Sequence, residues 1–390
     1  MGILLVLPVF GQDTGTAPAQ PAATAAPDPQ QGGSAPAPAP APAPPTWSVG
    51  PIQFSGAIDA YYGANFNHPA TQLNDLYNFN DLTNQFNLSL IKLAMSHDPD
   101  PVGFRVDLGY GRTMDDIVGS QPPGQSDFNK YVEQAYVSWK PKAAKGFEAD
   151  FGKFVTSAGA EVIESYSNWN YSRSLAFVLA LPYYHFGLRT SVPVGSHASV
   201  GFQLVNGWNN VTDNNSGKTV GFTGALTSSK ANYNINIYYG PENNGTNIGK
   251  TTLVDNVITL TPTGMLSAYV NYDYGQGRFA GPGTTLPAAV WQAFAAAVKF
   301  SPTSKWSFTP RGEWFQDRLG ARTLSGIPNT VVKEVTFTGE YKMIEGLLWR
   351  AEYRHDWSDQ KIFDRGLQAG SYGKQDTLTI AFVAFFGPMR

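Results

Sequence analysis

The fold is decided most clearly by residues 331–358, which read VVKEVTFTGEYKMIEGLLWRAEYRHDWS. On both sides of the short segment KMIEG, apolar and polar residues alternate with a period of two. One face carries Val335, Phe337, Gly339, Tyr341, Leu347, Trp349, Ala351, Tyr353 and Trp357. The other face carries Glu334, Thr336, Thr338, Glu340, Arg350, Glu352, Arg354 and Asp356. Since successive side chains of a β-strand point to opposite faces, this stretch predicts a β-hairpin with one apolar and one charged face.

The same pattern repeats along the chain from Ile52 onward, in segments rich in Tyr, Phe, Val and Thr. The expected strands are 52–67, 84–97, 103–113, 130–140, 147–156, 183–193, 197–208, 218–228, 231–240, 251–261, 264–275, 290–300, 304–317, 331–342, 346–358 and 376–386. Nine to eleven residues is the span of a tilted transmembrane β-strand. The Ala-rich piece at 288–298 and the stretch 157–164 leave the strand number open between about 14 and 18.

The connections between these strands alternate in length. Short turns read DPDPV, PKAAKG, PVGS, SSK, TPTG, SPTS and KMIEG. Longer connections occupy 68–83, 114–129, 157–182, 209–217, 241–250, 276–289, 318–330 and 359–375. Outer-membrane barrels have short periplasmic turns and long extracellular loops, whereas a soluble sandwich has no reason to keep this order. We therefore expect an all-β, transmembrane, antiparallel up-and-down β-barrel of about 16 strands in a bacterial outer membrane, with both termini periplasmic.

The composition excludes several classes of protein. Only 15% of the 390 residues are charged, against roughly 25% in a typical soluble domain. Mean hydropathy is −0.23, and no apolar run approaches the ~20 residues of a membrane-spanning helix. The net charge of −3 gives no reason to expect a nucleic-acid partner. The absence of cysteine excludes disulfide scaffolds, thiolate metal sites and cysteine nucleophiles.

The two ends of the chain predict export and assembly. Residues 1–11 contain the apolar stretch ILLVLPVF and are expected to be a truncated signal peptide. Residues 12–50 are rich in Ala and Pro and predict a disordered periplasmic tether that could reach the cell wall. The barrel is expected to occupy residues 51–390. Its last strand contains Phe386, an aromatic residue that would serve as the signal for the outer-membrane assembly machinery.

Charge decides which face of each strand points inward. Burying many charged groups in a packed core costs several kcal/mol each, whereas a water-filled lumen solvates them. Aromatic residues then face lipid, where Trp and Tyr form interfacial girdles. The predicted pore-lining residues are Arg105, Asp107, Arg189, Arg311, Glu313, Glu334, Glu340, Arg350, Glu352, Arg354 and Asp356. They could supply a transverse field for polar solutes, or they could form an ion-pair network that only braces the wall.

The third long connection, 157–182, is the longest. It is predicted to fold into the lumen as a constriction loop, with Glu161, Glu164, Tyr171 and Arg173 as its candidate residues. The alternative is a loop that packs on the outer mouth and covers the rim with its aromatic side chains.

The sequence gives little support to a metal site or an enzyme. Its five histidines are scattered, and none has ligand spacing on one element. His355 lies on the predicted outer row near the rim, so a barrel-embedded lipid hydrolase is a remote alternative to an interfacial residue. No cofactor, metal ligand or catalytic residue is assigned.

One region resembles a known family. The segments Glu133–Trp139, Asp150–Phe154, Gly159–Glu164 and Asn168–Ser174 are similar to the OmpL-like type of bacterial outer-membrane β-barrel porins. The resemblance extends over about residues 50–390, although the other strands match only in pattern. It implies an outer-membrane barrel that passes small solutes, and it brings no catalytic residues.

Two functions remain open at this stage. The first is a porin for passive diffusion of small polar solutes or ions, surrounded by outer-membrane lipid and lipopolysaccharide, with a homotrimer as one candidate assembly. The second is a non-conducting structural or adhesive barrel tethered to the cell wall. Conductance across a planar bilayer distinguishes the two.

Overall fold

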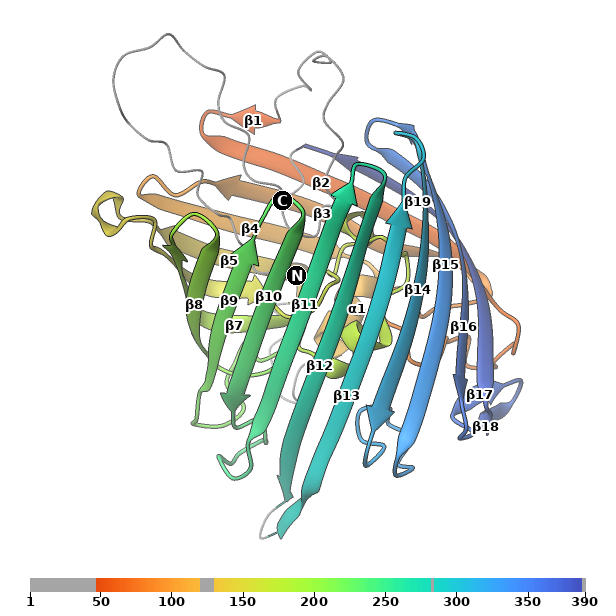
Figure 1. Ribbon diagram of the computed structural model, residues 1–390. Coiled ribbons are helices and arrows are strands. Elements are labelled where there is room, and N and C mark those ends of the chain that lie inside the picture. Colours follow the sequence, from red (N-terminus) through yellow and green to blue (C-terminus); the bar gives the residue numbers. More distant parts are fainter. Residues whose placement is uncertain (1–46, 120–129, 282–283, 388–390) are drawn as a thin grey trace.

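The computed structural model describes residues 47–119, 130–281 and 284–387 (Figure 1). The predicted signal peptide and most of the predicted tether therefore lie outside the described residues. The elements are β1 (Ser48–Val49), β2 (Ile52–Asn65), β3 (Gln85–His97), β4 (Val102–Tyr110), α1 (Arg112–Gly119), β5 (Val132–Trp139), η2 (Lys142–Ala144), β6 (Glu148–Val155), η3 (Ser165–Ser167), η4 (Ala176–Ala180), β7 (Tyr184–Val194), β8 (Ala198–Val205), β9 (Thr219–Thr227), β10 (Ala231–Gly240), β11 (Thr251–Thr263), β12 (Leu266–Gly281), β13 (Thr284–Phe300), β14 (Trp306–Asp317), β15 (Thr330–Ile344), β16 (Leu347–Ser358), β17 (Phe363–Arg365), β18 (Gln368–Tyr372) and β19 (Lys374–Phe386).

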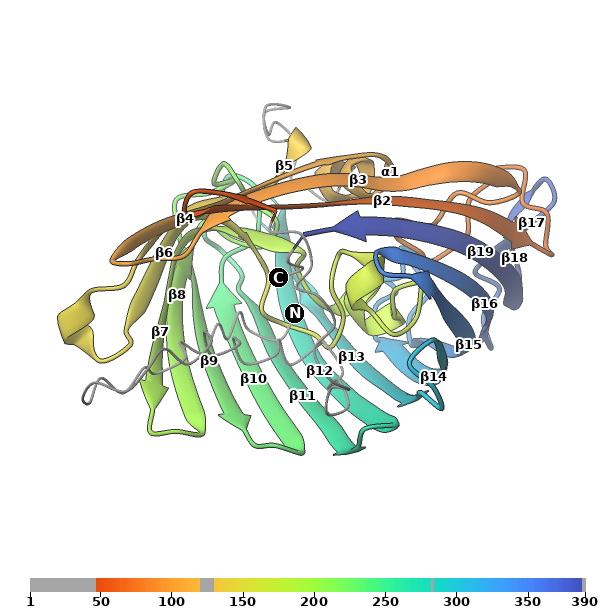
Figure 2. The same cartoon turned by 90° about the horizontal axis from the view of Figure 1, so that it is seen from above.

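Sixteen of these strands, β2 to β16 and β19, close into one antiparallel barrel, which confirms the predicted fold class. Each strand pairs with its neighbour in sequence, and β19 pairs with β2 to complete the ring, with Phe386 opposite Gly56. Figure 2 shows the closed wall from above. Short β1 adds to β2 through Ser48 and Val49, so residues 47–50 lie against the barrel. No helix of the described residues is long and apolar enough to cross a membrane.

The two rims differ as the sequence predicts, with one exception. Short turns join the strands at one rim, and long connections lie at the other (Figure 1). The predicted long connection at 276–289 was wrong, because β12 extends to Gly281 and β13 begins at Thr284. The Ala-rich piece at 288–298 is likewise strand. Helix α1 lies in the second long connection, where only a loop was expected.

Bulges in β3 and β5 change which side chains of these two strands face inward. In β3, Asp59 pairs with Leu90 and Ala60 pairs with Leu88, so Ser89 is an extra residue and the apolar face changes there. In β5, Asp107 pairs with Gln134 and Leu108 with Val132, so Glu133 is the extra residue. This bulge buries both Glu133 and Gln134 and mixes the two faces.

Candidate functional site

The connection between β6 and β7, residues 156–183, lies inside the barrel and is here called the inner segment. Figure 2 shows it as a yellow-green coil within the wall. Its residues Ala158, Tyr171, Leu175 and Ala180 are fully buried. Of the two arrangements that the sequence left open, the structure has the segment in the interior and not on the outer mouth. All four residues of the predicted constriction loop belong to it.

The polar row of β16 binds the backbone of the inner segment. Arg350 donates hydrogen bonds to the carbonyl oxygens of Ser165 and Asn168 (2.5 and 2.7 Å). Two residues further along the strand, the Glu352 carboxylate accepts hydrogen bonds from the backbone N–H groups of Tyr171 (2.5 Å) and Ser172 (2.8 Å).

Arg354, the next inward residue of this row, donates to the carbonyl oxygen of Arg173 at 2.7 Å. Its guanidinium also pairs with Asp356 and lies 4.1 Å from the centre of the Tyr77 ring. The β16 row therefore holds residues 165–173 by alternating donors and acceptors. Because a buried backbone polar group without a partner costs about 1–3 kcal/mol, these bonds fix the course of the segment.

A second group of charges joins the inner segment to β14 and β15. Arg311 lies between three carboxylates, those of Glu161 (2.8 Å), Glu313 (3.0 Å) and Glu334 (3.1 Å). Its guanidinium also donates to the carbonyl oxygen of Ser172 at 2.7 Å. The Arg311 side chain is fully buried. One cation thus compensates a carboxylate of the segment and two carboxylates of the wall.

Asp59 of β2, which is separated from β16 only by β19, also holds the same segment. Its carboxylate accepts hydrogen bonds from the Ser165 hydroxyl (2.5 Å) and the Tyr171 hydroxyl (2.7 Å). Arg173 braces the segment internally by donating to the carbonyl oxygens of Val162, Ile163 and Tyr171. Tyr171 and Arg173 therefore act within the segment's own structure, and both are buried.

Glu164 joins a cluster with Lys92 of β3 at its centre. The Lys92 ammonium pairs with Asp107 (2.9 Å), Glu133 (3.0 Å) and Glu164. Burial raises the pKa of Glu164, but the Lys92 charge outweighs burial and lowers this pKa below its ordinary value. The three carboxylates lie within the spacing of a metal site. Since the ammonium already bonds all three, the cluster is an internal ion-pair group. The predicted residue Arg105 adjoins it through Asp107 at 2.9 Å.

The remaining predicted lumen residues pair along the wall. Arg189 bonds Asp150 at 2.7 Å, and its guanidinium lies over the rings of Tyr136 and Phe154. Glu340 accepts a hydrogen bond from Arg350 at 2.6 Å. All eleven predicted pore-lining residues thus point into the barrel, and most touch one another or the inner segment. Their role in permeation stays a prediction.

The far side of the inner segment packs against an apolar strip that sequence reasoning missed. Ala293, Ala295 and Ala297 of β13 point inward and are buried together with Ala176 and Ala180 of η4. Trp291 donates its indole N–H to the carbonyl oxygen of Ala180 at 3.1 Å. Small side chains let the segment approach the wall closely. The signal in the sequence was a run of alanines on the inward face of a strand whose neighbours carry polar residues there.

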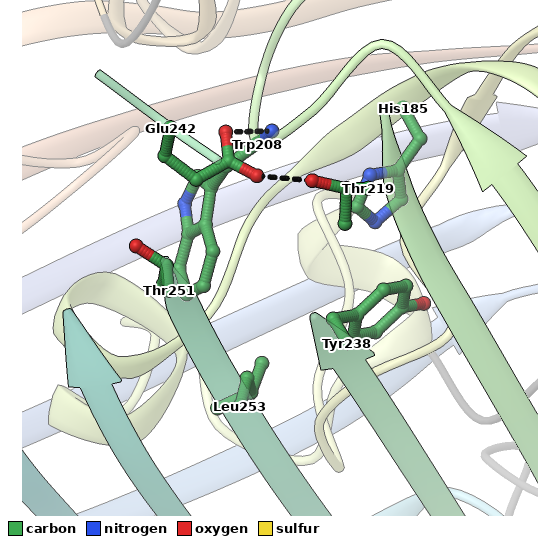
Figure 3. Close-up of a pocket in the computed structure, with 7 residues that line it drawn as sticks. All are labelled: His185, Trp208, Thr219, Tyr238, Glu242, Thr251 and Leu253. Atoms are coloured by element: carbon green, nitrogen blue, oxygen red, sulfur yellow. Dashed lines mark hydrogen bonds between the residues drawn. The ribbon is translucent and has the colours of Figure 1, made fainter. Parts of the chain in front are cut away.

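Two neighbouring long connections, 206–218 and 241–250, meet around Glu242, next to a small pocket (Figure 3). Its carboxylate accepts hydrogen bonds from the Trp208 backbone N–H (2.7 Å) and the Thr219 hydroxyl (2.5 Å). Trp208 packs in turn against Trp291, and Arg322 lies over both rings. Burial raises the pKa of Glu242 to about 7, although the two hydrogen bonds oppose this.

Packing of these two connections is expected to weaken between about pH 4.5 and pH 7. The folded state holds the Glu242 proton more tightly than the unfolded chain does. The protonated Glu242 therefore stabilises the folded state fully below its ordinary pKa of 4.5, and this contribution is lost as pH rises through 7. The stabilising free energy that Glu242 contributes falls by about 3 kcal/mol over this pH range. Hydrogen exchange of 206–218 and 241–250, compared with Glu242→Gln at each pH, measures it. Equal pH dependence in both proteins would contradict the prediction.

Comparison with known proteins gives a family and a set of folds. Residues 51–386 match the model of the beta-barrel porin-2, OmpL-like family. The outer-membrane channel DcaP of Acinetobacter baumannii is similar in structure (TM-score 0.57, 9% identity, 86% of this chain and 97% of that chain). The anion-selective porin from Comamonas acidovorans is also similar (TM-score 0.56, 7% identity, 86% of this chain and 99% of that chain). OmpT of Vibrio cholerae in a trimer form is similar as well (TM-score 0.55, 11% identity, 86% of this chain and 99% of that chain). At these identities the likeness shows the fold alone. No curated protein matches this sequence.

Proposed function

The chain belongs to the beta-barrel porin-2, OmpL-like family, and on this premise we propose that it allows passive diffusion of small polar solutes or ions across the outer membrane. The observation that carries the proposal is the inner segment, held across a polar barrel interior by charged side chains of the wall. Such a segment narrows the solute path through the barrel. The protein acts as a channel and not as an enzyme.

The orientation follows from the rims. The short turns face the periplasm and the long connections face the cell exterior, as in other outer-membrane barrels. Both ends of the barrel, at Ile52 and Phe386, then lie on the periplasmic side. We include a homotrimer in the proposal because OmpT of Vibrio cholerae, which shares the fold, occurs in a trimer form. Chemical cross-linking of the protein in outer-membrane vesicles tests this assembly.

Single-channel recording of the refolded protein in planar bilayers tests the function. We expect stepwise conductance in KCl. The absence of steps from a protein whose gel mobility changes on boiling, as that of a folded barrel does, would favour the non-conducting structural barrel. Ester hydrolysis abolished by His355→Ala would favour the lipid hydrolase instead.

The same recording measures selectivity. Arg189 pairs with Asp150, and its side chain is 11% exposed, so we expect it to border the solvated part of the lumen. Arg189→Gln leaves the carboxylate without its cation, and we expect the reversal potential in a KCl gradient to move towards cation preference. Lys230→Gln, an exposed residue in a short turn, is the control. A reversal potential equal to that of the unsubstituted protein would exclude Arg189 from the ion path.

A further inference from the structure

The outer face of β14, β15, β16 and β19 carries an alternating row of aromatic and cationic residues. The strand register places Trp314 opposite Lys333, Lys333 opposite Trp357, and Trp357 opposite Lys374. Both lysines are exposed and both tryptophans are partly exposed. These four residues are here called the Trp–Lys row. Strands lie about 4.8 Å apart, so the two lysines stand on the order of 10 Å from each other, with Trp357 between them.

The row lies at one edge of the lipid-facing surface. Below it, towards the short turns, Phe337, Tyr353 and Leu378 form an apolar row. Tyr341 of β15 and its partner Trp349 of β16 lie still closer to the short turns. Tyr341 is eight residues after Lys333 on the same strand. Eight residues span about 27 Å of strand, close to the apolar band of an outer-membrane barrel when tilt is included. The Trp–Lys row therefore lies at the membrane interface on the rim of the long connections.

An open groove of about 530 Å³ lies at this place on the outside of the barrel. Among its lining residues are His355, Trp357, Tyr372 and Lys374. Asp376 of β19 accepts a hydrogen bond from the Tyr353 hydroxyl (2.6 Å) and pairs with His355 (2.7 Å). Within the described residues, neither Lys333 nor Lys374 forms an ion pair with a carboxylate. The groove thus combines the ammonium group of Lys374 with aromatic faces, and Lys333 lies beside it, opposite Trp357 on the neighbouring strand.

We propose that the Trp–Lys row and its groove bind the phosphorylated sugar headgroup of a glycolipid in the outer leaflet. The ammonium groups pair with phosphates, and the face of Trp357 packs on a sugar ring. The acyl chains of the same lipid lie along the apolar row beneath. The charge of the row complements an anionic lipid and not a second copy of the same cationic surface. The proposal rests on the proposed orientation, because only the outer leaflet presents such lipids.

Native mass spectrometry of the detergent-solubilised full chain, titrated with bisphosphorylated lipid A, tests this site. We expect Lys333→Gln and Lys374→Gln each to weaken binding about fivefold and the double variant about 30-fold. Lys305→Gln combined with Lys342→Gln, at the opposite rim, should leave binding unchanged. Inorganic phosphate at millimolar concentration should not compete, since it lacks the sugar and the chains.

Three results would overturn the proposal. In the first, the double variant binds lipid A as tightly as the unsubstituted protein does. In the second, lipid A without its phosphates binds as tightly as bisphosphorylated lipid A. In the third, the substitutions change the oligomeric state of the protein and leave its affinity for lipid A unchanged. The conductance of the double variant separates this site from the proposed function. If the double variant loses lipid binding and conducts normally, both the lipid site and the porin function are supported. If the unsubstituted barrel binds lipid and never conducts, only the proposed porin function is refuted.

Discussion

Replacing Arg311 with methionine is expected to cost about 3–5 kcal/mol of stability, because it leaves buried carboxylates without their cation. Arg311 is the shared partner of Glu161, Glu313 and Glu334. Methionine keeps much of the side-chain volume, so the loss reports charge and hydrogen bonding more than a cavity. Thermal unfolding, followed by the gel mobility of unboiled samples, measures the effect.

Neutralising the carboxylates separates a charge effect from a packing effect. Arg311→Met combined with Glu161→Gln and Glu334→Gln should recover most of the lost stability, since fewer uncompensated charges remain buried. Lys305→Met, in an exposed short turn, is the control for loss of a cation. If Arg311→Met unfolds at the temperature of the unsubstituted protein, or if the neutralised variant is no more stable than the single one, the Arg311 group does not hold the inner segment.

The strands could be predicted because a barrel wall imposes a period of two on every residue. Because one face of the wall contacts lipid and the other faces polar groups, few residues depart from this alternation. All sixteen expected strands are present. The hairpin of β12 and β13 was shortened in the prediction because its tip is rich in Gly, Pro and Thr. Such a composition is typical of loops, yet the pairing of β12 with β13 continues to Gly281, which lies opposite Thr284.

The inward residues that were missed lie where local sequence is misleading. Lys92 stands between Ile91 and Leu93, and the bulge at Ser89 reverses the faces just before it. Asp59 is a single acid in an apolar strand. Both become explicable only when the inner segment brings Glu164 to Lys92 and Tyr171 to Asp59. These contacts join residues 72 and 112 positions apart, and contacts so distant in sequence leave no periodic signal.

The sequence did indicate that residues 157–182 were unusual, but it left two positions for them. Tertiary contacts decide between the interior and the outer mouth. The alanines of β13 leave room on one side, and the polar row of β16 supplies backbone partners on the other. The charges of Arg350, Glu352 and Arg354 therefore serve first as the support of the inner segment. A field acting on solutes would arise from the same residues only where water reaches them.

Replacing Glu352 with alanine is expected to enlarge the single-channel conductance. The carboxylate is the acceptor for the backbone N–H groups of Tyr171 and Ser172, and it also accepts from the Thr338 hydroxyl at 2.7 Å. Without it, buried donors lose their partner at a cost of about 1–3 kcal/mol each. The middle of the inner segment should then detach from β16 and leave more of the lumen to solvent. Larger and noisier steps in planar bilayers would report this.

Glu345→Ala is the matched control, because Glu345 is an exposed acid in the turn just before β16 and its partner is the nearby Lys342. Glu352→Gln gives a graded test, since the amide retains an acceptor oxygen for one of the two N–H groups while its own N–H₂ faces the other. Its conductance should fall between those of Glu352→Ala and the unsubstituted protein. This variant also keeps the test decisive if Glu352→Ala does not fold. Unchanged conductance in a folded Glu352→Ala barrel, or an equal increase in Glu345→Ala, would show that the β16 row does not set the width of the path.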